Sequence, residues 1–126
     1  MLFRSGALST FDSNFGWDGN SMKPIFQFQT IGISIDECTK ILKIPSPNYI
    51  KIDVDGLEHL ILSGGLEVLK NIDEILIEIN DNFKVQSEQC NLILTNAGLK
   101  LYKKAHSNLY DNLDGFNHSF NQIWKR

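Results

Sequence analysis

Five short segments of this chain have the hydrophobic patterns that predict β-strands. In some, apolar and polar residues alternate, as in a strand buried on one face, and in others the apolar residues run on almost without a break. Each is bounded by residues typical of turns or by a helix-like stretch. The segments are Ile25–Ile31, Tyr49–Val54, Glu74–Ile79, Leu99–Tyr102 and Asn121–Trp124.

The interval between the first two predicted strands has the pattern of a short helix. Ser34 and Glu37 are three residues apart and match a capping box, in which each side chain bonds to the other's backbone N–H. Apolar residues follow at helical spacing from Ile35, and Pro45 and Pro47 are expected to end the helix.

Two further helices are predicted between the later strands. The first is interrupted by Gly64-Gly65, and the second is capped by Gly98. Their expected buried residues are Leu57, Leu60, Ile61, Val68 and Leu69 in the first helix, and Val85, Leu92, Ile93 and Ala97 in the second.

The predicted order β-α-β-α-β-α-β-β indicates an α/β fold with parallel strands, right-handed crossovers and three layers. We expect residues 1–126 to form one domain. Residues 1–24 read as a loop or loose hairpin with a turn at Asp18-Gly19-Asn20, and residues 25–126 as the α/β part.

Composition narrows the class of protein. The chain has 126 residues, of which 42% are hydrophobic and 21% charged, as in an ordinary globular domain. A net charge of −3 argues against binding to nucleic acid through phosphate neutralisation. Neither a membrane-spanning apolar run nor a secretory leader is visible, and two cysteines are too few for a disulfide scaffold. These features predict a soluble cytoplasmic protein.

Acidic residues follow two of the predicted strands, where open α/β sheets bind ligands. Such carboxylates act as bases, hydrogen-bond acceptors or cation ligands. Alternatively, Asp55 caps the next helix and Glu78 bonds to backbone groups. The residues are Asp53, Asp55 and Gly56 after the second strand, and Glu78, Asn80 and Asp81 around the end of the third.

More specific motifs fail on their spacing. An EF-hand loop through Asp53-x-Asp55-Gly56 would need acidic residues where Lys51 and Leu62 stand. Glu58-His59 is not part of HExxH, and Ser63-Gly64-Gly65 matches neither a P-loop nor a dinucleotide fingerprint. His59 is expected to be solvated or partly packed.

The segment from Ile50 to Glu58 resembles the fourth-strand motif of FkbM-like methyltransferases, with Asp55 at a position where the family usually has glutamate. The resemblance extends over about Ser5 to Trp124. It also includes Leu62, Gly64-Gly65, the pair Ile35-Asp36, the strand Ile75–Ile79 and the serine-containing segment Gly6–Thr10.

The resemblance implies a Rossmann-like class I fold and transfer of a methyl group from S-adenosylmethionine to a hydroxyl of a sugar or secondary metabolite. It implies catalytic roles for Asp53, Asp55 and Glu78, and cofactor contacts for Asp53, Gly56 and Glu58. No metal is part of this reading. A metal-dependent alternative would use Asp53, Glu78 and Asp81 as oxygen ligands for Mg²⁺ or Ca²⁺.

The family's first strand and glycine-rich cofactor turn have no counterpart in the sequence. We therefore expect the C-terminal part of a domain truncated at the N-terminus, inactive alone. The open edge of Ile50–Val54 should then be covered by Phe26–Ile33, by a second copy in a homodimer or by the missing N-terminal half. The alternative function is a non-catalytic α/β module that completes a partner's sheet.

Overall fold

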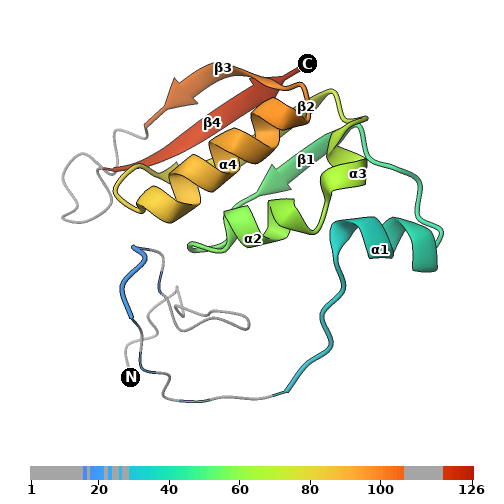
Figure 1. Cartoon of the computed structure of the whole chain (residues 1–126), viewed down its shortest axis with the longest axis horizontal. Helices are drawn as coiled ribbons and strands as arrows, with labels where there is room; N and C mark the ends of the chain where they lie inside the picture. The colour runs from blue at the N-terminus through green and yellow to red at the C-terminus, as the bar shows by residue number, and fades with distance from the viewer. Residues whose placement is uncertain (1–15, 17, 22, 24–25, 27–28, 107–117) are drawn as a thin grey trace, which may run out of the picture.

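The computed structural model describes residues 16, 18–21, 23, 26, 29–106 and 118–126. This part of the chain forms a sheet with helices packed against it (Figure 1). The elements are α1 (Ile35–Ile41), β1 (Tyr49–Ile52), α2 (Glu58–Ser63), α3 (Leu66–Leu69), β2 (Glu74–Asn80), α4 (Lys84–Asn96), β3 (Lys100–Ala105) and β4 (Ser119–Lys125).

The sheet has the strand order β1-β2-β4-β3 and is mixed rather than fully parallel. β1 and β2 are parallel, with Ile50 opposite Ile75. β4 lies between β2 and β3 and is antiparallel to both. The prediction of an α/β fold is confirmed, whereas parallel pairing throughout was wrong, because the chain reverses direction from β3 into β4.

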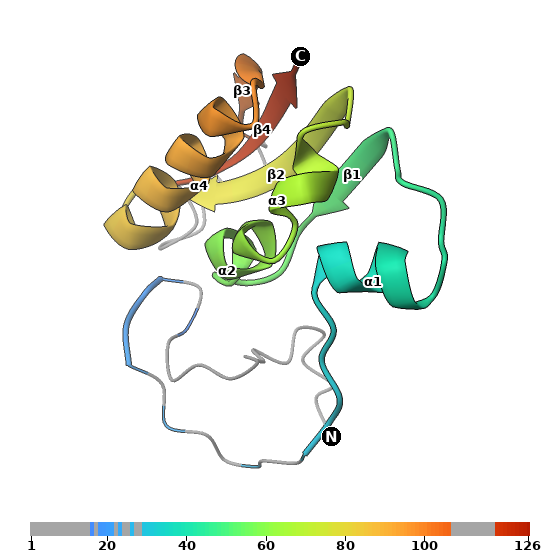
Figure 2. The ribbon, with the colours of Figure 1, turned by 45° about the vertical axis from the view of Figure 1, so that its right-hand side comes forward.

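The helices α2, α3 and α4 lie on one face of the sheet, with α1 beside α3 (Figure 2). Ile75, Ile77 and Ile79 point from β2 into the core under these helices, while Glu74 and Glu78 lie on the opposite face and are half-buried. The described helices therefore give two layers, and the expected third layer is not formed by them. Each fully buried isoleucine or leucine contributes about 1.5–3 kcal/mol.

The capping box at the start of α1 is confirmed. Glu37 N donates to Ser34 Oγ at 3.2 Å, and Ser34 N donates to Glu37 Oε2 at 3.2 Å. The helix ends at Ile41, and Lys43 has φ of 53°, so the chain turns away before it reaches Pro45.

The break at Gly64-Gly65 is also confirmed, because α2 ends at Ser63 and α3 begins at Leu66. A Cβ on Gly65 would lie 3.0 Å from Ile35 Cδ1, so glycine allows α1 to approach this turn closely.

The predicted strand at Ile25–Ile31 was wrong for the residues that the structure describes. Position 26 and residues 29–31 are not part of a strand, and Ile31 is 96% exposed. The chain before α1 runs away from the sheet (Figure 1). Since β1 stands at the edge of the described sheet, Phe26 and residues 29–33 do not cover it as expected.

The turn at Asp18-Gly19-Asn20 is confirmed. Gly19 has φ of 77°, and its N–H donates to Gly16 O at 3.0 Å. A Cβ on Gly19 would lie 2.5 Å from Phe83 Cδ2, so this turn packs directly on the Phe83 ring. The similarity at Gly6–Thr10 lies outside the described residues. In the described ranges, no helix is both long and apolar enough to span a membrane.

Candidate functional site

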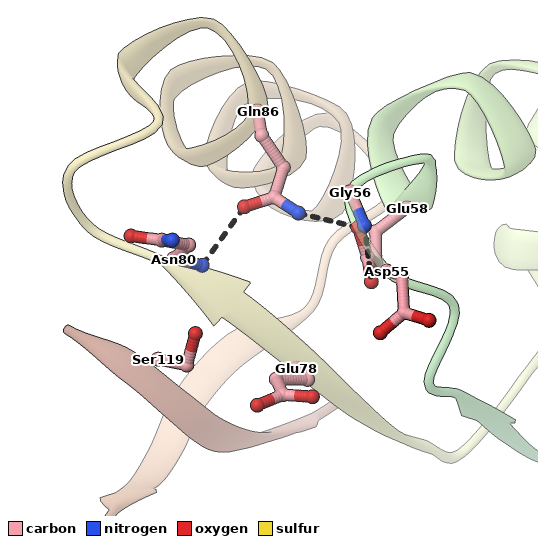
Figure 3. A pocket seen from close by; sticks show the side chains of 7 residues that line it. All are labelled: Asp55, Gly56, Glu58, Glu78, Asn80, Gln86 and Ser119. Carbon is pink, nitrogen blue, oxygen red and sulfur yellow. Dashed lines mark hydrogen bonds between the residues drawn. The ribbon is translucent and has the colours of Figure 1, made fainter. Parts of the chain in front are cut away.

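A small pocket opens where β1 and β2 end. Figure 3 shows its lining side chains, which come from the β1–α2 loop, the start of α2, β2, α4 and β4. Its volume is about 30 Å³, room for about two water molecules and too little to enclose an organic ligand. The lining residues are Asp55, Gly56, Glu58, Glu78, Asn80, Gln86 and Ser119.

The loop between β1 and α2 owes its shape to a tight turn. Leu57 N donates to Val54 O at 3.0 Å, and Gly56 has φ of 100°, a conformation that other residues rarely adopt. The N-cap of α2 is Leu57, with no side-chain cap, so Asp55 does not cap this helix. The Asp55 side chain instead lines the pocket (Figure 3).

Glu58 holds this loop from inside. It is the first residue of α2, and its side chain is buried, with an exposed fraction of 2%. Its Oε1 accepts from Val54 N at 3.3 Å and from Gly56 N at 3.5 Å. A carboxylate at a helix N-terminus is also favoured by the helix dipole.

Gln86 connects Glu58 to the end of β2. The Gln86 side-chain N–H donates to Glu58 Oε2, and Gln86 Oε1 accepts from Asn80 N at 2.8 Å. Both bonds are visible in Figure 3. Gln86 is 2% exposed, so its amide connects Glu58, at the start of α2, to the end of β2 in a place that water does not reach.

Two carboxyl groups of the site are harder to ionise than usual. Burial raises the pKa of Glu58, against hydrogen bonds that lower it. The pKa of Glu78 rises to about 7, because burial, hydrogen bonding with Asp53 and repulsion from Asp53, Glu58 and Asp55 all disfavour its charge. Glu78 is therefore partly protonated near neutral pH.

Asp53 behaves in the opposite sense. Lys51 Nζ lies 2.6 Å from Asp53 Oδ2, and this bond lowers the pKa of Asp53. Asp53 and Glu78 thus form a pair in which one carboxylate is kept ionised while its neighbour takes up a proton. Such separation of two carboxyl groups is typical of acid–base sites.

Four of the five residues predicted for the site line this pocket: Asp55, Gly56, Glu58 and Glu78. Asp53 lies at its margin, in contact with Glu78.

Asp81, the remaining acidic residue of the metal alternative, is bound to Lys104 at 2.6 Å. Within the described ranges, no group of three or more His, Cys, Asp or Glu side chains is placed to hold a metal ion. The set Asp53, Glu78 and Asp81 therefore does not form the metal site of that alternative.

Gln86 and Ser119 were missed by sequence reasoning. Gln86 carries a readable signal, because it lies four residues before Cys90 and eight before Leu94, the buried positions of α4. A glutamine on the buried face of a helix requires a polar partner. Ser119 gave no such signal, since its place in the pocket depends on β4 pairing with β2, which puts it opposite Asn80.

His59 is half-buried beside this site rather than in it. Its ring meets the Phe83 ring edge-on, with 5.7 Å between centroids, and burial lowers its pKa. His59 was expected to be solvated or partly packed, and the structure shows it partly packed, against the Phe83 ring.

The comparison with protein families shows which family the chain belongs to. The model of the methyltransferase FkbM domain matches residues 7–119, and the chain therefore belongs to the FkbM methyltransferase family. Comparisons with curated proteins and with solved structures gave no match.

The family uses S-adenosylmethionine in general, and the chemistry of this edge of the sheet agrees in part with such a ligand. Asp53, Asp55 and Glu78 bring three carboxyl groups together after β1 and near the end of β2, and carboxylates in general attract a cation. The pocket itself is too small to enclose the cofactor.

Proposed function

We propose that this chain takes part in methyl transfer from S-adenosylmethionine to a hydroxyl oxygen of a sugar or secondary metabolite. The observation that carries the proposal is the carboxyl pair Asp53 and Glu78, whose pKa values are driven in opposite directions at the strand ends. A base is most effective when its pKa lies near the working pH, and that of Glu78 is about 7.

In this proposal, Glu78 accepts the proton of the acceptor hydroxyl as its oxygen attacks. Asp53, held ionised by Lys51, orients that hydroxyl and adds negative charge beside the sulfonium. Asp55 contributes a third carboxylate from the loop. The cofactor supplies the electrophilic methyl group, and the proton is the only species that these side chains must move.

We assign the cofactor contacts to Asp53, Gly56 and Glu58, with different tasks. The positive φ of Gly56 and its missing Cβ allow a ligand to approach the loop backbone. Glu58 acts indirectly: its carboxylate accepts hydrogen bonds from the backbone N–H groups of Val54 and Gly56 and so holds the loop in place for this contact.

The proposal includes a Rossmann-like class I sheet in which β1 receives another strand. β1 has a neighbour on one side only in the described sheet, and an unpaired edge favours association. A second copy of this chain could pair with that edge, but the glycine-rich cofactor turn, which has no counterpart in this sequence, would have to come from a different polypeptide segment. Membership of a methyltransferase family favours this function over a non-catalytic module that completes a partner's sheet.

A cytoplasmic location belongs to the same proposal. Cys38 and Cys90 are both free, as is usual in a reducing compartment.

Calorimetric titration of the chain with S-adenosylmethionine and S-adenosylhomocysteine tests the assignment. Micromolar binding that Asp53→Asn weakens about tenfold or more would support the assignment. The matched variant Asp73→Asn changes an aspartate at the opposite end of the strands, just before β2, and should leave affinity unchanged. No heat with either ligand up to millimolar concentration would contradict cofactor binding by this chain, and equal effects of the two variants would contradict the site.

A further inference from the structure

The bond network around Gln86 joins three elements that meet at the site. Its amide lies between Glu58 of α2 and the backbone of Asn80 at the end of β2, while Gln86 itself belongs to α4. Both polar atoms of the amide, Oε1 and Nε2, have a buried partner. In a desolvated place such bonds hold their partners firmly, and an unpaired group is costly.

The direction of these bonds follows from their partners. A backbone N–H can only donate, so the Gln86 atom facing Asn80 N is the carbonyl oxygen Oε1. The Nε2 group must then face Glu58, where it donates to the carboxylate. A glutamine is therefore suited to this place because it offers one acceptor and one donor in the required order.

We propose that Gln86 is a positioning residue of this site, whose amide fixes the Glu58 carboxylate and the end of β2 relative to each other. The link continues through Glu58 Oε1 to the backbone of Val54 and Gly56, so that the loop after β1 is tied to β2. The importance of Gln86 for catalysis rests on the proposed function. The hydrogen-bonded connection between the loop and β2 does not, since it can be measured without cofactor.

The orientation of Glu58 also matters for Glu78. The charged groups that act on Glu78 are Asp53 and Asp55 after β1, Glu58 on α2, and Lys51 on β1 through its bond to Asp53. Losing the donor of Gln86 makes Glu58 easier to protonate, because burial already opposes its charge. Glu58 then holds its negative charge less readily, so its repulsion of Glu78 weakens and Glu78 becomes easier to ionise.

The experiment is an NMR titration of the chain labelled with ¹³C at glutamate side-chain carboxyls, together with amide hydrogen exchange. The main variant is Gln86→Leu, which keeps most of the side-chain volume and removes both bonds. Gln89→Leu is its matched control, since it makes the same change at an exposed position of α4. For Gln86→Leu we expect the Glu78 titration midpoint to fall by about 0.3–0.5 pH unit, because repulsion from Glu58 is one of the smaller causes of its raised pKa. We also expect the amides of Asn80 and Val54 to exchange about tenfold faster. Gln89→Leu should change neither.

A second variant, Gln86→Glu, keeps the inference testable if Gln86→Leu does not fold. When protonated, the new carboxyl group can donate to Glu58 and accept from Asn80 N, so the network is restored at low pH. At high pH it places a second negative charge beside Glu58 and the network opens. Amide protection of Asn80 and Val54 should therefore match the unaltered chain near pH 4 and fall above pH 7.

Three results would overturn the inference: a folded Gln86→Leu with unchanged Glu78 midpoint and protection, identical behaviour of Gln89→Leu, or pH-independent protection in Gln86→Glu. Failure to bind S-adenosylmethionine would count against the proposed function alone, since none of these readouts uses a ligand.

Discussion

Asp36 Oδ1 accepts a hydrogen bond from the backbone N–H of Val68 at 2.9 Å, across 32 positions of the chain. Its other oxygen accepts from Glu67 N at 3.0 Å, so one carboxylate satisfies two free N–H groups in the first turn of α3. Asp36 is part of the Ile35-Asp36 pair that resembles the family pattern. Asp36 connects α1 to α3 through these bonds, and it is not one of the residues that line the candidate site.

Replacing Asp36 by alanine should weaken this contact. Asp36→Ala is expected to lower the free energy of unfolding by about 1–2 kcal/mol, the usual cost of losing a side-chain cap. Urea denaturation measures the change. The control Glu67→Gln removes an exposed pair with Lys70 and should cost about 0.5 kcal/mol or less. Equal losses in the two variants would show that Asp36 does not act as a cap.

The close approach of α1 to Gly65 gives a double-mutant prediction. Gly65→Ala should destabilise the fold by about 1–3 kcal/mol, because the new Cβ would lie 3.0 Å from Ile35 Cδ1. Ile35→Val removes that methyl group, so the double variant should lose at least about 0.5 kcal/mol less than the sum of the single losses. Gly64→Ala is the control, since its Cβ would meet Ser34 instead and gain nothing from Ile35→Val. Strict additivity with Gly65→Ala would refute the contact.

The raised pKa of Glu78 predicts how stability depends on pH. In the unfolded chain this group has its ordinary pKa of 4.5, and in the folded chain its pKa is about 7. The folded state binds the proton more tightly, so this contribution to stability is fully present below pH 4.5 and is lost as the pH rises through 7. Glu78→Gln should therefore stabilise the chain above pH 7 and have little effect at pH 4.

The gain from Glu78→Gln should be about 1–2 kcal/mol at pH 8, allowing for solvent screening of a half-buried group. Thermal or urea unfolding of both proteins at pH 4 and pH 8 measures it. The exposed residue Glu88 on α4 provides the control Glu88→Gln. A gain that is the same at both pH values would mean that Glu78 ionises normally.

The two cysteines should differ sharply in reactivity. Burial, together with the charge of Glu58, raises the pKa of Cys90 to about 12, whereas Cys38 is only partly buried. With a thiol reagent such as DTNB at pH 8, we expect one fast thiol in the native chain and a second that reacts about 100-fold slower or only on unfolding. Cys38→Ser should abolish the fast phase. A fast phase that survives this substitution would place Cys90 at the surface.

Local sequence patterns predicted the helices and the later strands well, for reasons visible in single residues. Ser34 and Glu37 interact over three positions, and Gly98 has φ of 85° after α4, so both signals act within one turn of chain. The strand expected at Ile25–Ile31 failed because alternation alone does not supply a neighbouring strand. The antiparallel direction of β4 is set by pairing over a long sequence separation, which no local pattern encodes.

The candidate site was predictable where it follows the strands and unpredictable where it depends on packing. Asp55 and Gly56 follow β1, and the rule for strand ends located them, whereas Glu58 was assigned through the family resemblance. The helix face of α4 was misjudged, since Val85 and Leu92 are more than half exposed while Gln86 is buried. Apolar residues lie on both sides of α4, so their spacing alone did not show which side meets the sheet.

The position of β4 in the middle of the sheet has a consequence for folding. β2 and β3 are not neighbours, and each pairs with β4 instead. During synthesis, β3 therefore has no partner in the described sheet until residues 119–125 leave the ribosome, and β2 is paired along one edge only, with β1. Contacts over such sequence separations close slowly. We expect a late, concerted step in which β4 pairs with β2 and β3 at once. Until then, the edges of β2 and β3 that β4 will cover are exposed in the nascent chain and can aggregate.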